Sequence, residues 1–176
     1  MKHSNMIILL GYMGSGKSSV GQFIGQNNNL SYCDLDDYIQ EKEDMSISEV
    51  FQTRGEIYFR TKEHQYLKEI LNDKTYDILS LGGGTPCYAG NMDLIKNENL
   101  DSFYLKVDLE KLTERLFNQK NDRPLITAIK SKAALKDFIR KHLFEREFYY
   151  RQAKHIINVS NFSVDKISGH ILNQLK

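Results

Sequence analysis

The sequence predicts a single α/β domain in which a five-stranded parallel sheet is flanked by helices. Five short apolar runs alternate with segments of helical spacing, and a glycine-rich loop follows the first run. The chain has 176 residues, and at about 150 residues per domain that length leaves no room for a second large unit. We therefore expect one domain over residues 1–176.

The predicted strands are runs rich in β-branched and aromatic residues, which suit a sheet buried on both faces. They lie at residues 6–10, 30–33, 76–81, 102–107 and 155–159. Helical spacing fills the intervals, and Ser46 with Glu49 has the pattern of a capping box, which predicts a helix start. Residues 109–117, 133–151 and 164–175 are the clearest of the later helices.

Composition excludes several classes of function. The chain has 24 basic and 23 acidic residues and a net charge of +1, so no overall charge attracts nucleic acid or an anionic membrane. No apolar run approaches the roughly 20 residues of a membrane span. Cys33 and Cys87 are too few for a disulfide scaffold and lack metal-ligand spacing. We expect a cytoplasmic monomer that binds neither nucleic acid nor membrane.

The strongest motif follows the first strand. Residues 11–18 read G-Y-M-G-S-G-K-S, which matches the phosphate-binding loop G-x-x-x-x-G-K-[ST] in full. Its glycines let successive backbone N–H groups converge on phosphate oxygens, Lys17 bridges the β- and γ-phosphates from an exposed position, and the Ser18 hydroxyl ligates Mg²⁺. The expected ATP-binding residues of this loop are Gly14, Ser15, Gly16, Lys17, Ser18 and Ser19.

The loop alone does not identify the phosphoryl acceptor. The N-K-x-D pattern that specifies guanine is absent from the sequence, which argues against a switch GTPase. A chain this short has no room for mechanical domains. These observations favour a small-molecule kinase.

Two carboxylates follow the second predicted strand. If that strand extends through Asp36, its period of two turns Asp34 and Asp36 the same way at the edge where parallel α/β sheets bind ligands. One carboxylate could then hold hydrated Mg²⁺, and the other could accept a hydrogen bond from a substrate hydroxyl. The alternative is an acidic first turn of a helix, which Asp36 and Asp37 would also suit.

A second cluster combines Arg60 with a triple glycine. Arginine suits a substrate carboxylate because its planar fork matches two oxygens. Arg60 could also form surface pairs with Glu56 and Glu63, or Glu63 could orient it. The glycines at 82–84 permit close backbone approach to a ligand, although a plain turn after the third strand is the alternative.

Taken together, these elements resemble shikimate kinase over nearly the whole chain. The elements are the phosphate loop, D-L-D at 34–36, G-E-I-Y-F-R at 55–60 with Glu63, G-G-G at 82–84, D-R-P-L at 122–125, and Arg146 with Tyr150. The resemblance implies a P-loop kinase of the nucleoside-monophosphate kinase type. It also implies ATP-dependent phosphorylation of the shikimate 3-hydroxyl, giving shikimate 3-phosphate and ADP in aromatic amino-acid biosynthesis.

The resemblance also implies roles for individual residues. Asp34 would help Ser18 to hold Mg²⁺, and Asp36 would bind the acceptor hydroxyls and act as a base. The substrate-binding residues would be Asp36, Arg60, Gly82, Gly83, Gly84 and Arg146, and the catalytic residues Lys17, Asp36 and Arg123.

Two segments are implied as well, a helical substrate-binding segment at about 34–62 and a mobile lid at about 113–127 that carries Arg123. Arg123 would contact ATP and neutralise charge on the transferred phosphoryl group. Arg151 is the alternative to Arg146 for the substrate carboxylate. Adenine contacts are expected from residues 160–164, without a named residue.

Other readings remain open. Gluconate kinase and nucleoside-monophosphate kinases share this scaffold, although Arg60 and the triple glycine favour shikimate. A non-catalytic ATP-binding protein is a third reading, and the presence of Lys17, Asp34, Asp36 and Arg123 together argues against it.

Overall fold

The computed structural model describes residues 5–96, 100–119 and 124–175. Its strands are β1 (Met6–Leu10), β2 (Tyr32–Asp34), β3 (Ile78–Ser80), β4 (Leu100–Lys106) and β5 (His155–Asn158). They pair in parallel in the order β2-β3-β1-β4-β5, and the predicted five-stranded parallel sheet is confirmed. β1 and β3 are fully buried, as expected for strands covered on both faces.

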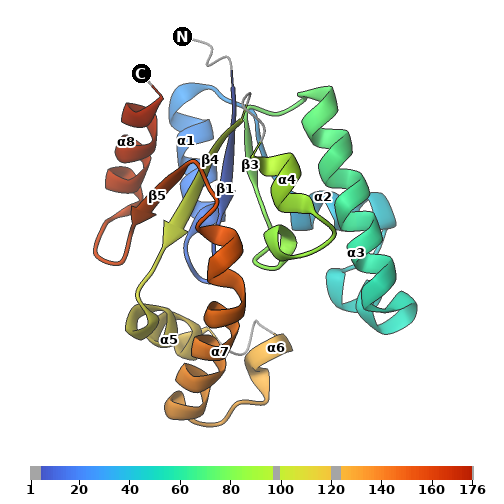
Figure 1. The fold of residues 1–176 in the computed structure, drawn as a ribbon, viewed down its shortest axis with the longest axis vertical. Coiled ribbons are helices and arrows are strands. Elements are labelled where there is room, and N and C mark those ends of the chain that lie inside the picture. The colour runs from blue at the N-terminus through green and yellow to red at the C-terminus, as the bar shows by residue number, and fades with distance from the viewer. Residues whose placement is uncertain (1–4, 97–99, 120–123, 176) are drawn as a thin grey trace.

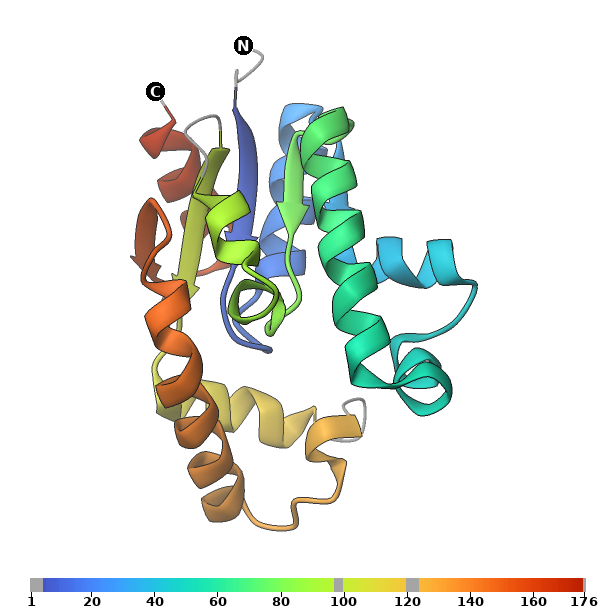
Figure 2. The same cartoon turned by 45° about the vertical axis from the view of Figure 1, so that its right-hand side comes forward.

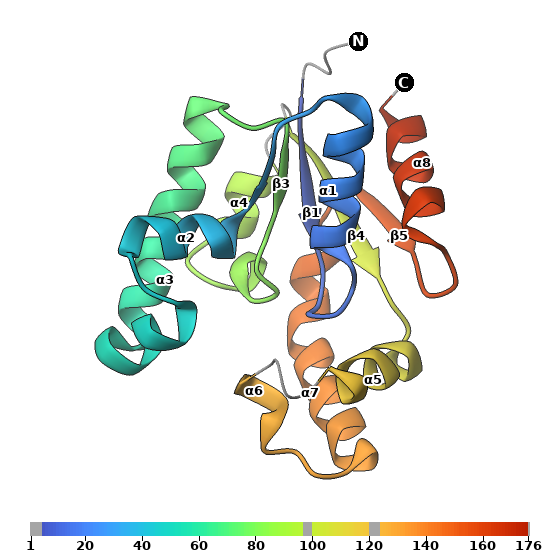
Figure 3. The same ribbon diagram turned by 180° about the vertical axis from the view of Figure 1, so that it is seen from behind.

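The helices form a layer on each face of the sheet and a cluster beyond one end. Helices α1 and α8 pack together on one face (Figure 3), whereas α3 and α4 lie on the opposite face (Figure 1). The helices are α1 (Lys17–Asn28), α2 (Leu35–Glu43), α3 (Ile47–Asp73), α4 (Asn91–Ile95), α5 (Leu109–Asn118), α6 (Pro124–Thr127), α7 (Lys132–Tyr150) and α8 (Val164–Gln174), with the short 3₁₀ turn η1 (Thr85–Cys87).

Local sequence signals explain where several helices begin. The predicted capping box of α3 is present, since Ser46 and Glu49 bond reciprocally. Gly55 interrupts α3 with φ 82° and ψ 170°, a backbone conformation that favours glycine. The second strand does not extend through Asp36, and the alternative of an acidic helix start is present instead. β2 ends at Asp34, whose side chain accepts a hydrogen bond from the Asp36 backbone N–H and caps α2.

The arrangement leaves one end of the sheet open. Figure 2 shows α5, α6 and most of α7 beyond the carboxyl ends of the strands, facing the kinked start of α3. Ligands bind at this end of open parallel sheets. Within the described residues, no helix is long and apolar enough to cross a membrane.

Candidate active site

The phosphate loop joins β1 to α1 at the open end of the sheet. Gly14 and Gly16 have φ values of 76° and 95°, which side-chain-bearing residues rarely adopt. The Ser15 N–H donates to the Tyr12 carbonyl at 3.1 Å and closes the turn. Lys17 starts α1, so the sequence G-S-G-K places the loop at a helix N-terminus, where anions bind.

Lys17 is buried, and the expectation of an exposed lysine is wrong. Only 9% of its surface is accessible, and its Nζ donates to the carbonyls of Gly11 at 3.0 Å and Tyr12 at 3.1 Å. The ammonium group is therefore held inside the loop by the loop's own backbone.

Ser18 and Asp34 lie together beside the loop. The Ser18 Oγ donates to Asp34 Oδ2 at 2.7 Å, and the Tyr32 hydroxyl approaches the same oxygen at 3.3 Å. These are hard oxygen donors, as Mg²⁺ prefers. Among the described residues no group of three or more His, Cys, Asp or Glu side chains gathers into a metal site. The two oxygens fit a Mg²⁺ that takes its other ligands from water and phosphates.

Asp36 lies in the first turn of α2 and is half-buried. Burial raises the pKa of its carboxyl to about 6, the charges of Asp34 and Glu63 add to this, and Lys17 acts in the opposite direction. A Cβ at Gly82 would lie only 2.7 Å from Asp36 Oδ1, so the close approach of this carboxylate requires glycine there. The two alternatives considered for Asp36 are therefore both present, because it belongs to a helix N-terminus and also lines the open end of the sheet.

Two neighbouring pockets meet at Asp36. The first, which we call the loop pocket, has a volume of about 480 Å³ and is lined by residues 13–20 together with Asp34, Asp36, Leu81, Gly82, Gly83, Arg115, Gln119, Phe162, Val164 and Ile167. The second, the arginine pocket, has a volume of about 280 Å³ and is lined by Met13, Asp36, Ile47, Phe51, Phe59, Arg60, Glu63, Gly82, Gly83, Gly84, Leu125 and Arg146. Met13, Asp36, Gly82 and Gly83 line both.

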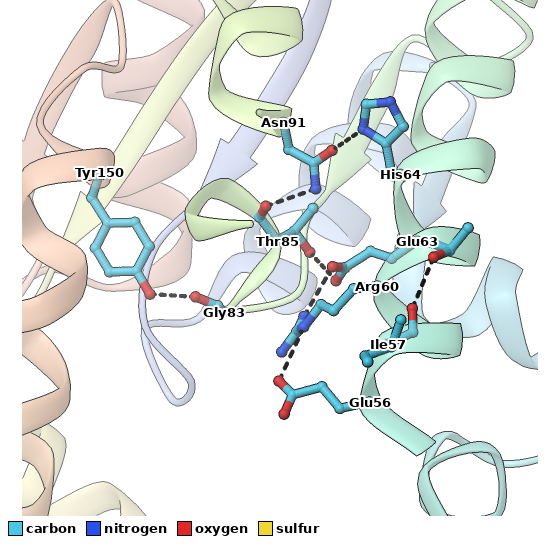
Figure 4. A network of polar contacts seen from close by, with 10 residues as sticks. Glu56, Ile57, Arg60, Glu63, His64, Gly83, Thr85, Asn91 and Tyr150 are labelled. Carbon is cyan, nitrogen blue, oxygen red and sulfur yellow. Dashed lines mark hydrogen bonds and ion pairs between the residues drawn. The ribbon is translucent and has the colours of Figure 1, made fainter. Parts of the chain in front are cut away.

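Arg60 reaches the arginine pocket from α3 (Figure 4). Its guanidinium NH1 donates to Glu63 Oε2 at 2.9 Å, and its Nε lies 3.5 Å from the more exposed Glu56. Glu63 is 1% exposed and also accepts a hydrogen bond from Thr85 at 2.7 Å. The ion pair between Arg60 and Glu63 is therefore buried and supported by the Thr85 hydroxyl, unlike a surface pair.

Arg60 is further confined by its neighbours. Its guanidinium lies over the Tyr88 ring at 4.0 Å, and a Cβ at Gly84 would lie 3.0 Å from NH2. The triple glycine is therefore more than a plain turn, because Gly82 makes room for Asp36 and Gly84 makes room for Arg60.

Arg146 reaches the same pocket from α7. Its guanidinium lies 5.8 Å from the centre of the Tyr12 ring. Arg151, the alternative, pairs with Glu147 at 2.9 Å and does not line the arginine pocket. Arg123 lies outside the described residues.

Several residues that line the loop pocket, among them Arg115, Gln119, Phe162 and Val164, were not named by sequence reasoning. Arg115 donates from its guanidinium to the Gly14 carbonyl at 3.2 Å, and Gln119 lies one turn further along. Phe162 and Val164 come from the segment expected to contact adenine, and Phe162 is 39% exposed. A large aromatic residue in a polar loop was the available signal for Phe162. Nothing in the sequence distinguished Arg115 from other helix-surface arginines.

Comparisons with known proteins agree on one family. A family model described as shikimate kinase matches residues 13–176. A shikimate kinase of Flavobacterium johnsoniae is 43% identical over 169 residues, which is 96% of this chain and 98% of that protein.

Solved structures give the same result. The crystal structure of shikimate kinase from Bacteroides thetaiotaomicron has a TM-score of 0.87 at 31% identity, over 97% of this chain and 98% of that one. The shikimate kinase of Acinetobacter baumannii in complex with shikimate has a TM-score of 0.84 at 28% identity, over 99% and 94% of the two chains.

Proposed function

The chain belongs to the shikimate kinase family, and from this premise we propose that it transfers the γ-phosphoryl group of ATP to the 3-hydroxyl of shikimate. The products are shikimate 3-phosphate and ADP. One observation supports placing the reaction at this site. A pocket built on a phosphate loop and a pocket lined by two arginines share Asp36, so a nucleotide in one and an acid in the other would meet there.

The loop pocket takes ATP. Lys17 is held at the helix start by two carbonyls, and from there its ammonium group can bind the β- and γ-phosphates without reorganising the loop. Gly14, Ser15, Gly16, Ser18 and Ser19 supply backbone and hydroxyl donors to the phosphates. Arg115 of α5 and Phe162, which precedes α8, both line the pocket and are suited to stack on the nucleobase.

Mg²⁺ accompanies ATP and would be held by Ser18 and Asp34. When bound, it would neutralise phosphate charge and polarise the transferred group. Tyr32 and the Asp36 backbone N–H hold the Asp34 carboxylate in place.

The arginine pocket takes shikimate. Arg60 and Arg146 bind its carboxylate from two different helices, and Glu63 holds the Arg60 guanidinium for this contact. The backbone of residues 82–84 contacts the hydroxyl face, since glycine lets the ligand approach closely. Asp36 accepts the hydrogen bond of the attacking hydroxyl. A loose phosphoryl-transfer transition state needs orientation more than proton removal, so orientation is the main role of Asp36.

We also propose that residues 34–62 form the substrate-binding segment and that residues 113–127 form a lid. In this proposal Arg123 closes on the transferred phosphoryl group and excludes water. We further propose a monomer as the active form.

A coupled assay of ADP release tests the function. With Mg-ATP the protein should turn over shikimate, and gluconate, AMP and CMP should give no more than the rate without acceptor. Gluconate keeps a carboxylate and hydroxyls but lacks the cyclohexene ring, so it is the informative control. Equal turnover of gluconate would contradict the assignment of the arginine pocket to shikimate.

A further inference from the structure

One face of α7 carries three polar side chains at intervals of four residues, His142, Arg146 and Tyr150. Residues four apart on a helix lie on the same face, one turn above the other. The middle member lines the arginine pocket. His142 contacts the phosphate loop, and Tyr150 contacts the glycine loop at residues 82–84.

The first contact joins α7 to the phosphate loop. The Tyr12 hydroxyl lies 3.2 Å from His142 Nδ1, and the two residues are 130 positions apart in the sequence. Tyr12 is 1% exposed, and the His142 ring also packs on Phe138 with 4.1 Å between ring centres. The hydrogen bond is thus partly buried, because Tyr12 is buried and His142 is half-buried.

The second contact joins α7 to the glycine loop (Figure 4). The hydroxyl of Tyr150 donates to the Gly83 carbonyl. The Tyr150 ring is fully buried and packs on Tyr104 of β4, with 5.1 Å between ring centres. Gly83 lines both pockets, so this bond fixes a piece of backbone that both substrates would touch.

Arg146 is held by its aromatic neighbours Tyr12 and Tyr150 and not by a carboxylate of the described residues. Arg60 is paired with Glu63 and Glu56, whereas Arg146 has no carboxylate partner among the described residues. Burial raises the pKa of Tyr12 and Tyr150 and lowers that of His142, and the positive charge of Arg146 acts to lower all three, so the guanidinium lies near all three side chains. The position of Arg146 therefore depends on the position of α7, much of which lies beyond the edge of the sheet (Figure 2).

We propose that Tyr12, His142 and Tyr150 are positioning residues for the acceptor. Their two hydrogen bonds fasten α7 to the phosphate loop on one side of Arg146 and to the glycine loop on the other. They thereby set the distance between the arginine that binds the shikimate carboxylate and the loop that binds ATP. This inference rests on the proposed function.

Removing single hydroxyl groups tests the inference. Tyr12→Phe and Tyr150→Phe each delete one hydrogen bond and keep the packed ring. Tyr149→Phe is the matched control, because we find no hydrogen bond from its hydroxyl within the described part of the chain. Wild-type turnover of shikimate, measured first, tests the proposed function by itself. Thermal melting then establishes that each variant is folded at the assay temperature.

We expect both variants to raise the KM for shikimate about three- to tenfold, the effect of one neutral hydrogen bond. The KM for ATP should change less than about twofold, because Lys17 is held by the Tyr12 carbonyl and not by its hydroxyl. A residue with a purely structural role would not separate the two constants. His142→Phe should raise the KM for shikimate as Tyr12→Phe does. The double variant with both Tyr12→Phe and His142→Phe should raise this KM no more than the larger of the two single variants.

Three results would overturn the inference while leaving the proposed function intact. The first is an unchanged KM for shikimate in both folded tyrosine variants. The second is an equal rise in the KM for ATP and for shikimate. The third is an effect of Tyr149→Phe as large as that of Tyr150→Phe.

Discussion

Substituting Asp36 by Asn should change stability and activity in opposite directions. Asn keeps the shape of the side chain and removes its charge. Folding raises the pKa of Asp36 from its ordinary 3.8 to about 6, chiefly by burial. At about 1.4 kcal/mol for each pKa unit, keeping this carboxylate ionised at neutral pH costs the fold at most about 3 kcal/mol. Without ligands and metal ions, the Asp36→Asn protein should therefore melt about 2–10 °C higher than the wild type at pH 7.

The sign of the pH dependence follows from the same shift. Well below the unfolded pKa of 3.8 the carboxyl is protonated in both the folded and the unfolded protein, so wild type and Asp36→Asn should be equally stable. As pH rises, the unfolded chain ionises first, and the wild type loses stability relative to the variant until pH passes about 6. Above that pH the difference should stay constant. Asp37→Asn is the matched control for activity, since Asp37 is exposed and lines neither pocket. Burial and the charge of Asp34 also raise the pKa of Asp37, so its stability should shift in the same direction.

Activity should move the other way. If Asp36 mainly orients the attacking hydroxyl, the KM for shikimate should rise and kcat should fall by less than about 10²-fold, with ATP affinity nearly unchanged. Melting curves in EDTA and steady-state kinetics on the same preparations measure both effects. An Asp36→Asn protein that is less stable than wild type at pH 7 would refute the burial argument. Wild-type kcat together with wild-type KM would refute the placement of the acceptor.

Three further substitutions test the other parts of the site. Lys17→Ala should abolish turnover and lower the melting temperature slightly, because it leaves the carbonyls of Gly11 and Tyr12 without their ammonium donor; normal turnover in the folded variant would remove Lys17 from the phosphate site. Arg60→Ala should weaken shikimate binding by about 2–5 kcal/mol and ATP binding far less, because it removes one partner of a buried carboxylate; calorimetric titration with each substrate separates the two, and equal losses would count against the arginine pocket. Arg123→Ala should lower kcat without unfolding the protein, as single-turnover kinetics and a melting curve would show, and an unchanged kcat would end its proposed role at the phosphoryl group.

The sheet could be predicted because its signal is local. β1 and β3 are short apolar runs bounded by polar or glycine-rich segments, and burial on both faces leaves no other use for such runs. The phosphate loop could be predicted for a similar reason, since its spacing is set by the ligand. The roles drawn from it for individual residues stay predictions.

The features of the site that sequence analysis did not predict depend on contacts between distant segments. Lys17 was expected to be exposed, and its burial follows from the way the carbonyls of Gly11 and Tyr12 fold back over it. Whether Asp36 continues the strand or starts a helix was left open, and the side chain of Asp34 caps a helix at that point. Arg115 and Phe162 meet at the loop pocket only because α5 and the segment before α8 return to the same edge of the sheet.

The central claim is that the two pockets form one site that phosphorylates the 3-hydroxyl of shikimate. The most direct test is a proton–phosphorus correlation NMR spectrum of the product formed from Mg-ATP and shikimate. The account predicts a single phosphate ester whose phosphorus couples to the proton at C3, with one ADP formed for each ester. An ester at another hydroxyl, or release of inorganic phosphate without any ester, would contradict it.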